Sequence, residues 1–118
     1  MRDYNKLRAF ELADALVILI YQVTRNFPKD ELYGLTSQMR RSAVSVPSNI
    51  VEGSTRTSQV EYLRFLEIAF GSLKELHYQF SIASRLKYIK EKDIIEFESN
   101  FIETEKVLSS LIRSLHKA

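Results

Sequence analysis

The sequence predicts an all-α fold, a single domain over residues 1–118 arranged as an antiparallel up-down-up-down four-helix bundle. Apolar residues recur at steps of three and four in four separate segments, which is the spacing of one face of an α-helix. Only three Gly and two Pro occur among the 118 residues, so the helices are expected to be long and their connections short. Short connections force consecutive helices to run antiparallel, which gives the topology.

The first helix is expected between Phe10 and Phe27. Its apolar stripe consists of Phe10, Ala13, Val17, Ile20, Thr24 and Phe27. A second apolar stripe runs beside the first and consists of Leu12, Leu16, Leu19 and Val23. A helix that is apolar over more than one face is usually buried on two sides. Pro28 ends this helix, because the residue before a proline is pushed out of the α region.

The second helix is expected to begin at Thr36, whose hydroxyl suits an N-cap, and to end at Gly53, which suits the position after a helix terminus. One face of this helix carries Leu35, Met39, Ala43, Val46 and Ile50. Pro47 lies inside the pattern, where it removes one backbone hydrogen bond. We interpret it as a kink in a continuous helix. The alternative is two shorter helices, with Pro47 in the first turn of the second.

The third helix is the longest, and its start is marked by the capping box Ser58–Glu61. Its seam consists of Tyr62, Leu66, Ala69, Leu73, Leu76, Phe80 and Ala83. Gly71 lies in the middle, where glycine costs about 1 kcal/mol relative to alanine, so we expect close approach of another backbone there. The helix should end near residues 87–89.

The fourth helix is expected to begin with Asp93 and Glu96 as a second capping pair. Its apolar positions alternate by three and four residues throughout: Ile94, Phe97, Phe101, Thr104, Leu108, Leu111 and Leu115. This is the heptad spacing of bundle packing, and it completes the predicted fold.

Self-association is predicted because helices 1 and 3 carry more apolar surface than one bundle stripe requires. Large exposed apolar patches mark interfaces, and a symmetric assembly would cover them. The candidate interface residues are Leu12, Leu16, Leu19, Val23, Phe65 and Phe70. The alternative is a broad core stripe with some scattered exposed apolar residues.

No catalytic chemistry, metal or cofactor is predicted. Di-metal sites in helical bundles need Glu-x-x-His motifs, and neither His77 nor His116 follows a glutamate at the required spacing. We expect His77 to be packed or interfacial and His116 to lie near a frayed end. No Gly-x-Ser-x-Gly turn or phosphate-binding glycine loop occurs, and the chain has no Cys.

A cytoplasmic location without membrane association is expected. The N-terminal residues lack the apolar region of a signal peptide. The longest apolar run, Ala15–Tyr21, is far shorter than the roughly 20 residues of a membrane span. The lack of Cys is compatible with a reducing compartment.

Basic residues provide the remaining functional feature, although the net charge is only +2. The candidate nucleic-acid-binding residues are Arg40, Arg41, Arg56, Arg85, Lys87, Lys90 and Lys92. Arg40, Arg41 and Arg56 are expected near one end of the bundle, and the others around the turn between helices 3 and 4. Phosphate binding requires such charges to share one surface. The alternatives are that these charges solvate the helices, or that Arg40 or Arg41 pairs with a glutamate at a subunit contact: Glu52, Glu61 or Glu75.

Three stretches carry a family resemblance: Glu31–Arg41 (ELYGLTSQMRR), Ser45–Gly53 (SVPSNIVEG) followed by Arg56 and Ser58, and Phe65–Leu76 (FLEIAFGSLKEL). They closely resemble the bacterial four-helix-bundle family named after proteins encoded in intervening sequences of 23S ribosomal RNA genes, also called the S23 ribosomal protein family. The resemblance implies an antiparallel bundle with Pro47 inside helix 2, a homopentameric ring and no known catalytic activity. Similar bundles serve as accessory proteins of diversity-generating retroelements, where a strongly basic pentameric barrel binds nucleic acid and a reverse transcriptase. The weak net charge of this chain departs from those barrels.

The sequence therefore favours a non-enzymatic homo-oligomeric bundle, with its own copies as partners and with RNA or DNA as a further partner. The alternative is a protein-interaction scaffold without a nucleic-acid role. A third hypothesis is a small-molecule site in the bundle or in the lumen of the ring, which requires a pocket.

Overall fold

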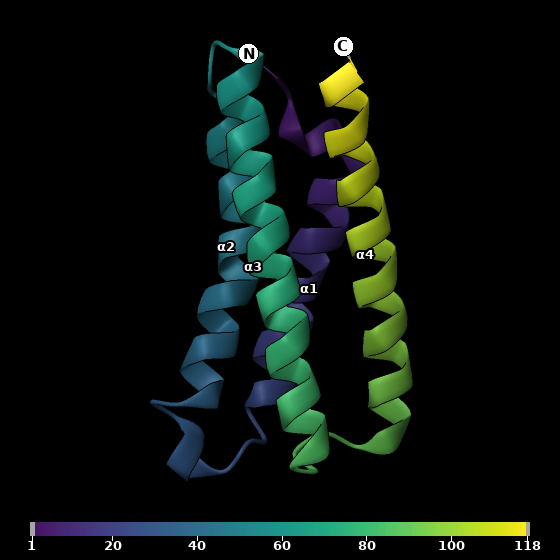
Figure 1. Cartoon of the computed structure of the whole chain (residues 1–118). Coiled ribbons are helices and arrows are strands. Elements are labelled where there is room, and N and C mark those ends of the chain that lie inside the picture. Colours follow the sequence, from purple (N-terminus) through teal and green to yellow (C-terminus); the bar gives the residue numbers. More distant parts are fainter. Residues whose placement is uncertain (1, 118) are drawn as a thin grey trace.

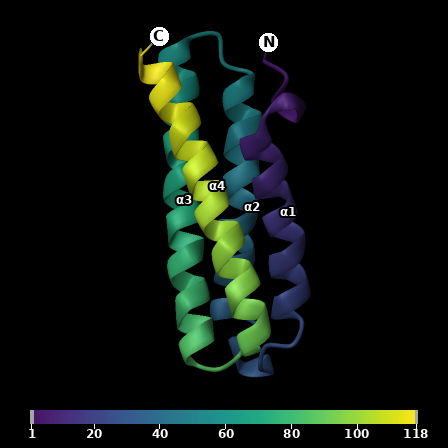
Figure 2. The same cartoon turned by 90° about the vertical axis from the view of Figure 1, so that its right-hand side faces the viewer.

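The protein is a bundle of four α-helices, described by a computed structural model for residues 2–117. The helices are α1 (Arg8–Thr24), α2 (Leu35–Ser54), α3 (Gln59–Arg85) and α4 (Glu91–Lys117), with short 3-10 turns η1 (Tyr4–Lys6) and η2 (Lys29–Glu31). In Figure 1 both labelled chain ends lie at one end of the bundle and the α3–α4 turn at the other. In Figure 2 α4 is nearest to the viewer, with α3 on its left and α1 on its right, and it packs against both. The predicted all-α four-helix architecture is confirmed.

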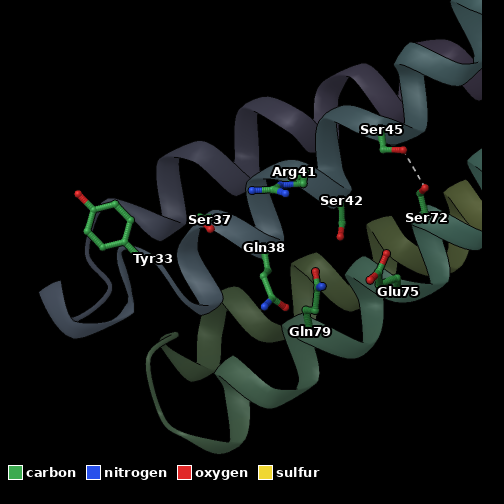
Figure 3. Close-up of a pocket in the computed structure, with 9 residues that line it drawn as sticks. All are labelled: Tyr33, Ser37, Gln38, Arg41, Ser42, Ser45, Ser72, Glu75 and Gln79. Atoms are coloured by element: carbon green, nitrogen blue, oxygen red, sulfur yellow. Dashed lines mark hydrogen bonds between the residues drawn. The ribbon is translucent and has the colours of Figure 1, made fainter.

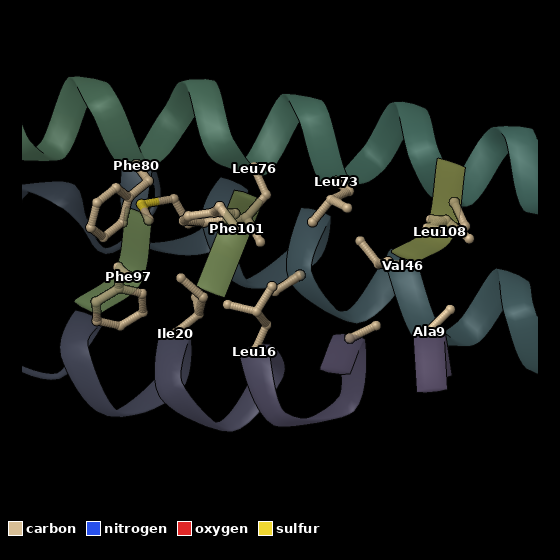
Figure 4. Close-up of a cluster of buried hydrophobic side chains, with 14 of the residues drawn as sticks. Ala9, Leu16, Ile20, Val46, Leu73, Leu76, Phe80, Phe97, Phe101 and Leu108 are labelled. Atoms are coloured by element: carbon tan, nitrogen blue, oxygen red, sulfur yellow. The ribbon is translucent and has the colours of Figure 1, made fainter. Parts of the chain in front are cut away.

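The core is filled by large apolar side chains from all four helices (Figure 4). Its most deeply buried members are Phe80, Phe101, Ile20, Met39, Ile50, Leu66, Leu73, Leu76 and Leu108. Each such side chain stabilises the fold by about 1.5–3 kcal/mol through burial. Leu16 belongs to this core and is only 2% exposed, which corrects its place among the candidate interface residues. Its side chain has almost no surface left for a second molecule.

The junction between α1 and α2 differs from the prediction at both ends. Helix α1 ends at Thr24 rather than Phe27, although Phe27 is still buried. Helix α2 begins at Leu35, so Thr36 is inside the helix and is not its N-cap. The capping acceptor is instead Glu31, whose Oε1 accepts a hydrogen bond from the Leu35 amide at 3.1 Å. A carboxylate at this position also complements the positive end of the helix dipole.

Helix α2 is continuous through Pro47, as the kinked-helix interpretation predicted. It extends to Ser54, so Gly53 is a helical residue and not the residue after the helix. The reason for a glycine there is space. A Cβ added to Gly53 would lie 2.7 Å from the Cβ of Phe65 on α3, closer than packed atoms approach. Gly53 therefore allows α2 and α3 to pack closely.

Helix α3 begins as predicted, with the Ser58 hydroxyl accepting from the Glu61 amide at 3.2 Å. It ends at Arg85, two residues before the predicted range. The Lys87 amide then donates to the Ser84 carbonyl and the Tyr88 amide to the Ala83 carbonyl, each at 3.0 Å. This is a Schellman motif, and it places Lys87 at φ 64°, the left-handed region that favours glycine.

Two further sequence expectations are corrected on α3 and α4. No neighbouring helix approaches Gly71, because an added Cβ would meet no atom of another element within 4 Å. The capping pair Asp93–Glu96 does not form the start of α4, which begins two residues earlier at Glu91. Asp93 lies in the first turn instead, where its charge still favours the helix dipole.

Candidate interaction surface

The Arg40 side chain contacts residues of α1, close to the junction of α1 and α2. Its Nε donates to the Thr24 hydroxyl at 2.9 Å, and Thr24 donates in turn to the Ile20 carbonyl at 2.7 Å. The Arg40 guanidinium also lies over the Tyr21 ring, 4.7 Å from its centroid. These contacts give Arg40 a structural role.

Arg56 does not lie near Arg40 and Arg41, contrary to the sequence expectation. Arg56 follows the end of α2, and 15 residues separate it from Arg40. Most of these residues are helical, so the separation along the helix axis is about 20 Å. Its guanidinium covers the Phe65 ring at 4.7 Å and lies 3.5 Å from the Glu52 carboxylate. Arg56 therefore packs within its own subunit at the end of the bundle opposite the α3–α4 turn.

The α3–α4 turn presents three lysines to solvent, Lys87, Lys90 and Lys92. None of them forms an ion pair with another residue in the range 2–117. Arg85, beside them, bonds to Ser81 of its own helix through both a carbonyl and a hydroxyl at 3.2 Å. The charges of these three lysines therefore remain available for a ligand.

A polar groove of about 550 Å³ runs between α2 and α3 (Figure 3). Its lining is Tyr33, Ser37, Gln38, Arg41, Ser42, Ser45, Ser72, Glu75 and Gln79. The Ser45 and Ser72 hydroxyls bond across it at 2.8 Å, which joins the two helices. Gln79 is 6% exposed, and its Oε1 has no donor among the described residues. Arg41 and Glu75 both line the groove without forming an ion pair with each other.

His77 joins α3 to α4 through two carboxylates. Its Nδ1 lies 2.5 Å from Glu105 and its Nε2 lies 2.7 Å from Glu98, while its ring stacks on Phe101 with centroids 4.4 Å apart. Lys74 adds a contact of 3.4 Å to Glu105. Burial of the ring disfavours its charge, but the hydrogen bonds to Glu98 and Glu105 outweigh burial and raise the His77 pKa above its ordinary value. This agrees with the expectation of a packed histidine.

The exposed apolar surface lies on different residues from those chosen by periodicity. Leu19, Val23 and Phe70 are half-buried and pack on the core, and Leu12 is half-buried on α1. Phe65 is half-buried beneath Arg56. The large apolar side chains that are at least half exposed are Ile18, Leu32, Tyr33, Val60, Tyr78, Leu86, Ile95 and Ile102, and Ile68 is 46% exposed. Most of them lie on α1, α3 and α4, and on α2 the side chain of Val44 is 39% exposed.

Sequence reasoning missed the residues that define these surfaces. The residues Ile68, Ser72, Glu75 and Gln79 recur at steps of four and three, so their shared face on α3 was accessible from spacing alone. The pairing of His77 with carboxylates on α4 was not accessible, because it depends on the relative position of two helices.

The described residues also bear on metal binding and on membrane spanning. Among residues 2–117, no group of three or more acidic, histidine or cysteine side chains is placed to bind a metal ion. No helix within the same residues combines the length and the apolar composition needed to cross a membrane.

Comparison with known proteins identifies the family. A solved chain from Bacteroides thetaiotaomicron VPI-5482, described as a protein of unknown function from the S23 ribosomal protein family, has the same fold with a TM-score of 0.78. The two are 22% identical, and the match covers 88% of this chain and 97% of that one. No curated protein matches significantly. The family model for 23S rRNA-intervening sequence proteins matches residues 5–110, and the chain therefore belongs to that family.

Proposed function

We propose that this protein is a non-enzymatic helical bundle that self-associates and that contacts nucleic acid as an assembly. Self-association rests on one observation, the apolar side chains left in water on α4. Ile95 is 75% and Ile102 59% exposed, and with Ile94 and Val107 they line one contiguous surface. Single exposed apolar residues are ordinary, but a continuous apolar surface marks an interface.

The resemblance to the family favours five copies in a closed ring, and this number is part of the proposal. A ring is built from heterologous contacts, in which two different surfaces of each copy meet. Exposed apolar residues lie on α1, α3 and α4, so this bundle offers more than one surface for such contacts. Repetition around a ring would also multiply any weak ligand contact through effective concentration.

Nucleic-acid contact is assigned to Lys87, Lys90 and Lys92 of the α3–α4 turn. Their charges are not used in ion pairs among residues 2–117. Lys87 also occupies a left-handed position where a non-glycine residue costs about 1–2 kcal/mol. A strained residue kept where glycine would be more stable supports a role for its side chain.

Filter binding to a structured RNA and to duplex DNA across a salt series tests the nucleic-acid role. We expect the affinity to fall as salt rises, because phosphate binding releases counterions. The variant Lys87→Gln/Lys90→Gln/Lys92→Gln should weaken binding and reduce the salt slope by about 1 for each phosphate that is no longer neutralised. The control Lys6→Gln/Lys117→Gln removes exposed lysines at the opposite end and should leave binding unchanged.

The absence of binding at low salt would refute the nucleic-acid role. The alternative, a protein-interaction scaffold, makes a different prediction for affinity capture. A partner protein that remains bound after nuclease treatment, combined with no nucleic-acid binding, would replace the first function with the second.

A further inference from the structure

We propose that the outer face of α3 beside the α2–α3 groove receives helix α4 of a second copy of this chain. The receiving face consists of Arg41, Ile68, Gly71, Glu75 and Tyr78. The inserted ridge consists of Ile95, Ile102 and Lys106 on α4. This inference rests on the proposed self-association and adds which surfaces meet.

Gly71 supplies the first argument. A glycine within a helix costs about 1 kcal/mol relative to alanine, and its usual benefit is close packing of another backbone. Gly53 shows that benefit inside this bundle, because its missing Cβ makes room for Phe65 at 2.7 Å. At Gly71 nothing from another element lies within 4 Å. The close approach expected from the sequence is therefore absent within one copy, and a second copy can provide it.

Two exposed apolar side chains flank Gly71 on the outer face of α3. Ile68, one helical turn before it, is 46% exposed, and Tyr78, two turns after it, is 62% exposed. Together with Gly71 they follow the spacing of one helix face. A helix seated over the glycine would bury both side chains.

The polar groups of the groove supply the second argument. Arg41 from α2 and Glu75 from α3 line the same groove without pairing with each other. Arg41 and Glu75 are both exposed, so charged groups of a neighbouring copy can reach them and pair with them.

Helix α4 is the matching occupant among the surfaces of this chain. Ile95 and Ile102 are seven residues apart, so they lie on one ridge, and both are more than half exposed. Lys106 follows Ile102 by one turn and offers a cation to Glu75. Ile102 and Gly71 both lie near the middle of their helices.

The receiving face and the ridge lie on different helices, so the contact is heterologous. Each copy then presents a receiving face to one neighbour and a ridge to the other. Such a contact generates a closed ring when the rotation closes, in keeping with the proposed assembly.

Cysteine cross-linking tests the pairing directly, because the natural chain has no Cys. The double variant Gly71→Cys/Ile102→Cys should form, on mild oxidation, a ladder of covalent multimers on a non-reducing gel. The control Ala15→Cys/Ile102→Cys moves one thiol to the exposed face of α1 and should form no ladder. Each single variant should also remain uncross-linked, since a heterologous contact brings two different positions together.

The variant Gly71→Trp provides a second measurement. An added Cβ at Gly71 meets no atom within 4 Å and the residue is exposed, so the indole should extend into solvent in the monomer. The helical circular dichroism should therefore be retained while the oligomer dissociates towards the 13.8 kDa chain. Ala15→Trp is the matched control and should leave the mass unchanged. If Gly71→Trp remains an oligomer and Gly71→Cys/Ile102→Cys forms no ladder, this contact is overturned while self-association stands. A natural chain that is monomeric would overturn both.

Discussion

At the scale of single residues, four positions have roles that their surroundings determine. Gly53 and Gly71 are both helical, yet only Gly53 is required by packing within one subunit. Lys87 occupies a position suited to glycine, whereas His77 holds two carboxylates of another helix. Each of these positions leads to a measurable consequence.

Gly53→Ala should destabilise the fold by about 1 kcal/mol, because the cost of overpacking exceeds the gain in helix propensity. The obstructing atom is the Phe65 Cβ, which cannot move without its backbone. Urea denaturation measures the free energy of unfolding. Gly71→Ala is the matched control: measured on dissociated chains, it should stabilise by up to about 1 kcal/mol. A Gly53→Ala protein as stable as the natural one would contradict the close packing of α2 and α3.

Lys87→Gly should have opposite effects on stability and on binding. Relief of the left-handed backbone should raise the free energy of unfolding by about 1 kcal/mol. Loss of the charge should weaken RNA binding and reduce its salt dependence. Urea denaturation and filter binding measure the two effects. If Lys87→Gly gains stability and binds RNA as well as the natural chain, Lys87 has no part in phosphate contact.

His77→Gln should destabilise the protein more at pH 6 than at pH 9. The folded pKa of His77 is raised, so the stabilisation by its charged form is complete below the unfolded pKa of about 6.5 and is lost as the pH rises through the folded pKa. Hydrogen bonds to charged groups are worth about 1.5–3 kcal/mol, which sets the scale of the loss at pH 6. Urea denaturation at both pH values measures it. A pH-independent difference would mean that His77 is neutral in the folded protein.

At the scale of elements, the connection before α2 depends on one carboxylate. Glu31 accepts from the Leu35 amide at 3.1 Å and from the Tyr88 hydroxyl at 2.9 Å, so it ties the start of α2 to the α3–α4 turn. The hydrogen bond to Glu31 raises the pKa of Tyr88. The neighbouring connection after α3 is held by the Schellman motif around Lys87.

Glu31→Ala should cost about 1–2 kcal/mol of unfolding free energy, the usual loss for an N-terminal capping acceptor. Hydrogen exchange should also become faster at the Leu35 amide. Asp30→Ala, one residue earlier on the exposed side of η2, is the control and should be nearly neutral. Equal effects of the two variants would show that general charge, and not capping, stabilises the start of α2.

The helices themselves could be predicted from the sequence because the apolar spacing persists over many turns. Their ends were less accessible: Thr36 and Asp93 have the chemistry of caps, but Glu31 and the first turn at Glu91 compete with them successfully. The candidate interface residues differ from the exposed apolar residues for a similar reason. Periodicity identified Leu16 and its stripe as apolar, but only the packing of four helices decides which apolar face points inward.

At the scale of the whole molecule, the structure separates two kinds of surface. One end of the bundle carries three lysines that form no ion pair among residues 2–117, while the sides carry exposed apolar residues and the α2–α3 groove. Arg40 and Arg56 were expected on the same binding surface, yet they lie near opposite ends of α2 and pack within the subunit. Side surfaces suit contact between copies, and the end suits a ligand shared by several copies.

Sedimentation velocity of the natural chain over a concentration range tests the central claim most directly. The account predicts a discrete oligomer at micromolar concentration, because the apolar surface of α4 would be covered by another copy. Five copies are the number that the family resemblance favours. A single species of 13.8 kDa at every concentration would contradict it, since the apolar surface of each chain would then remain in water.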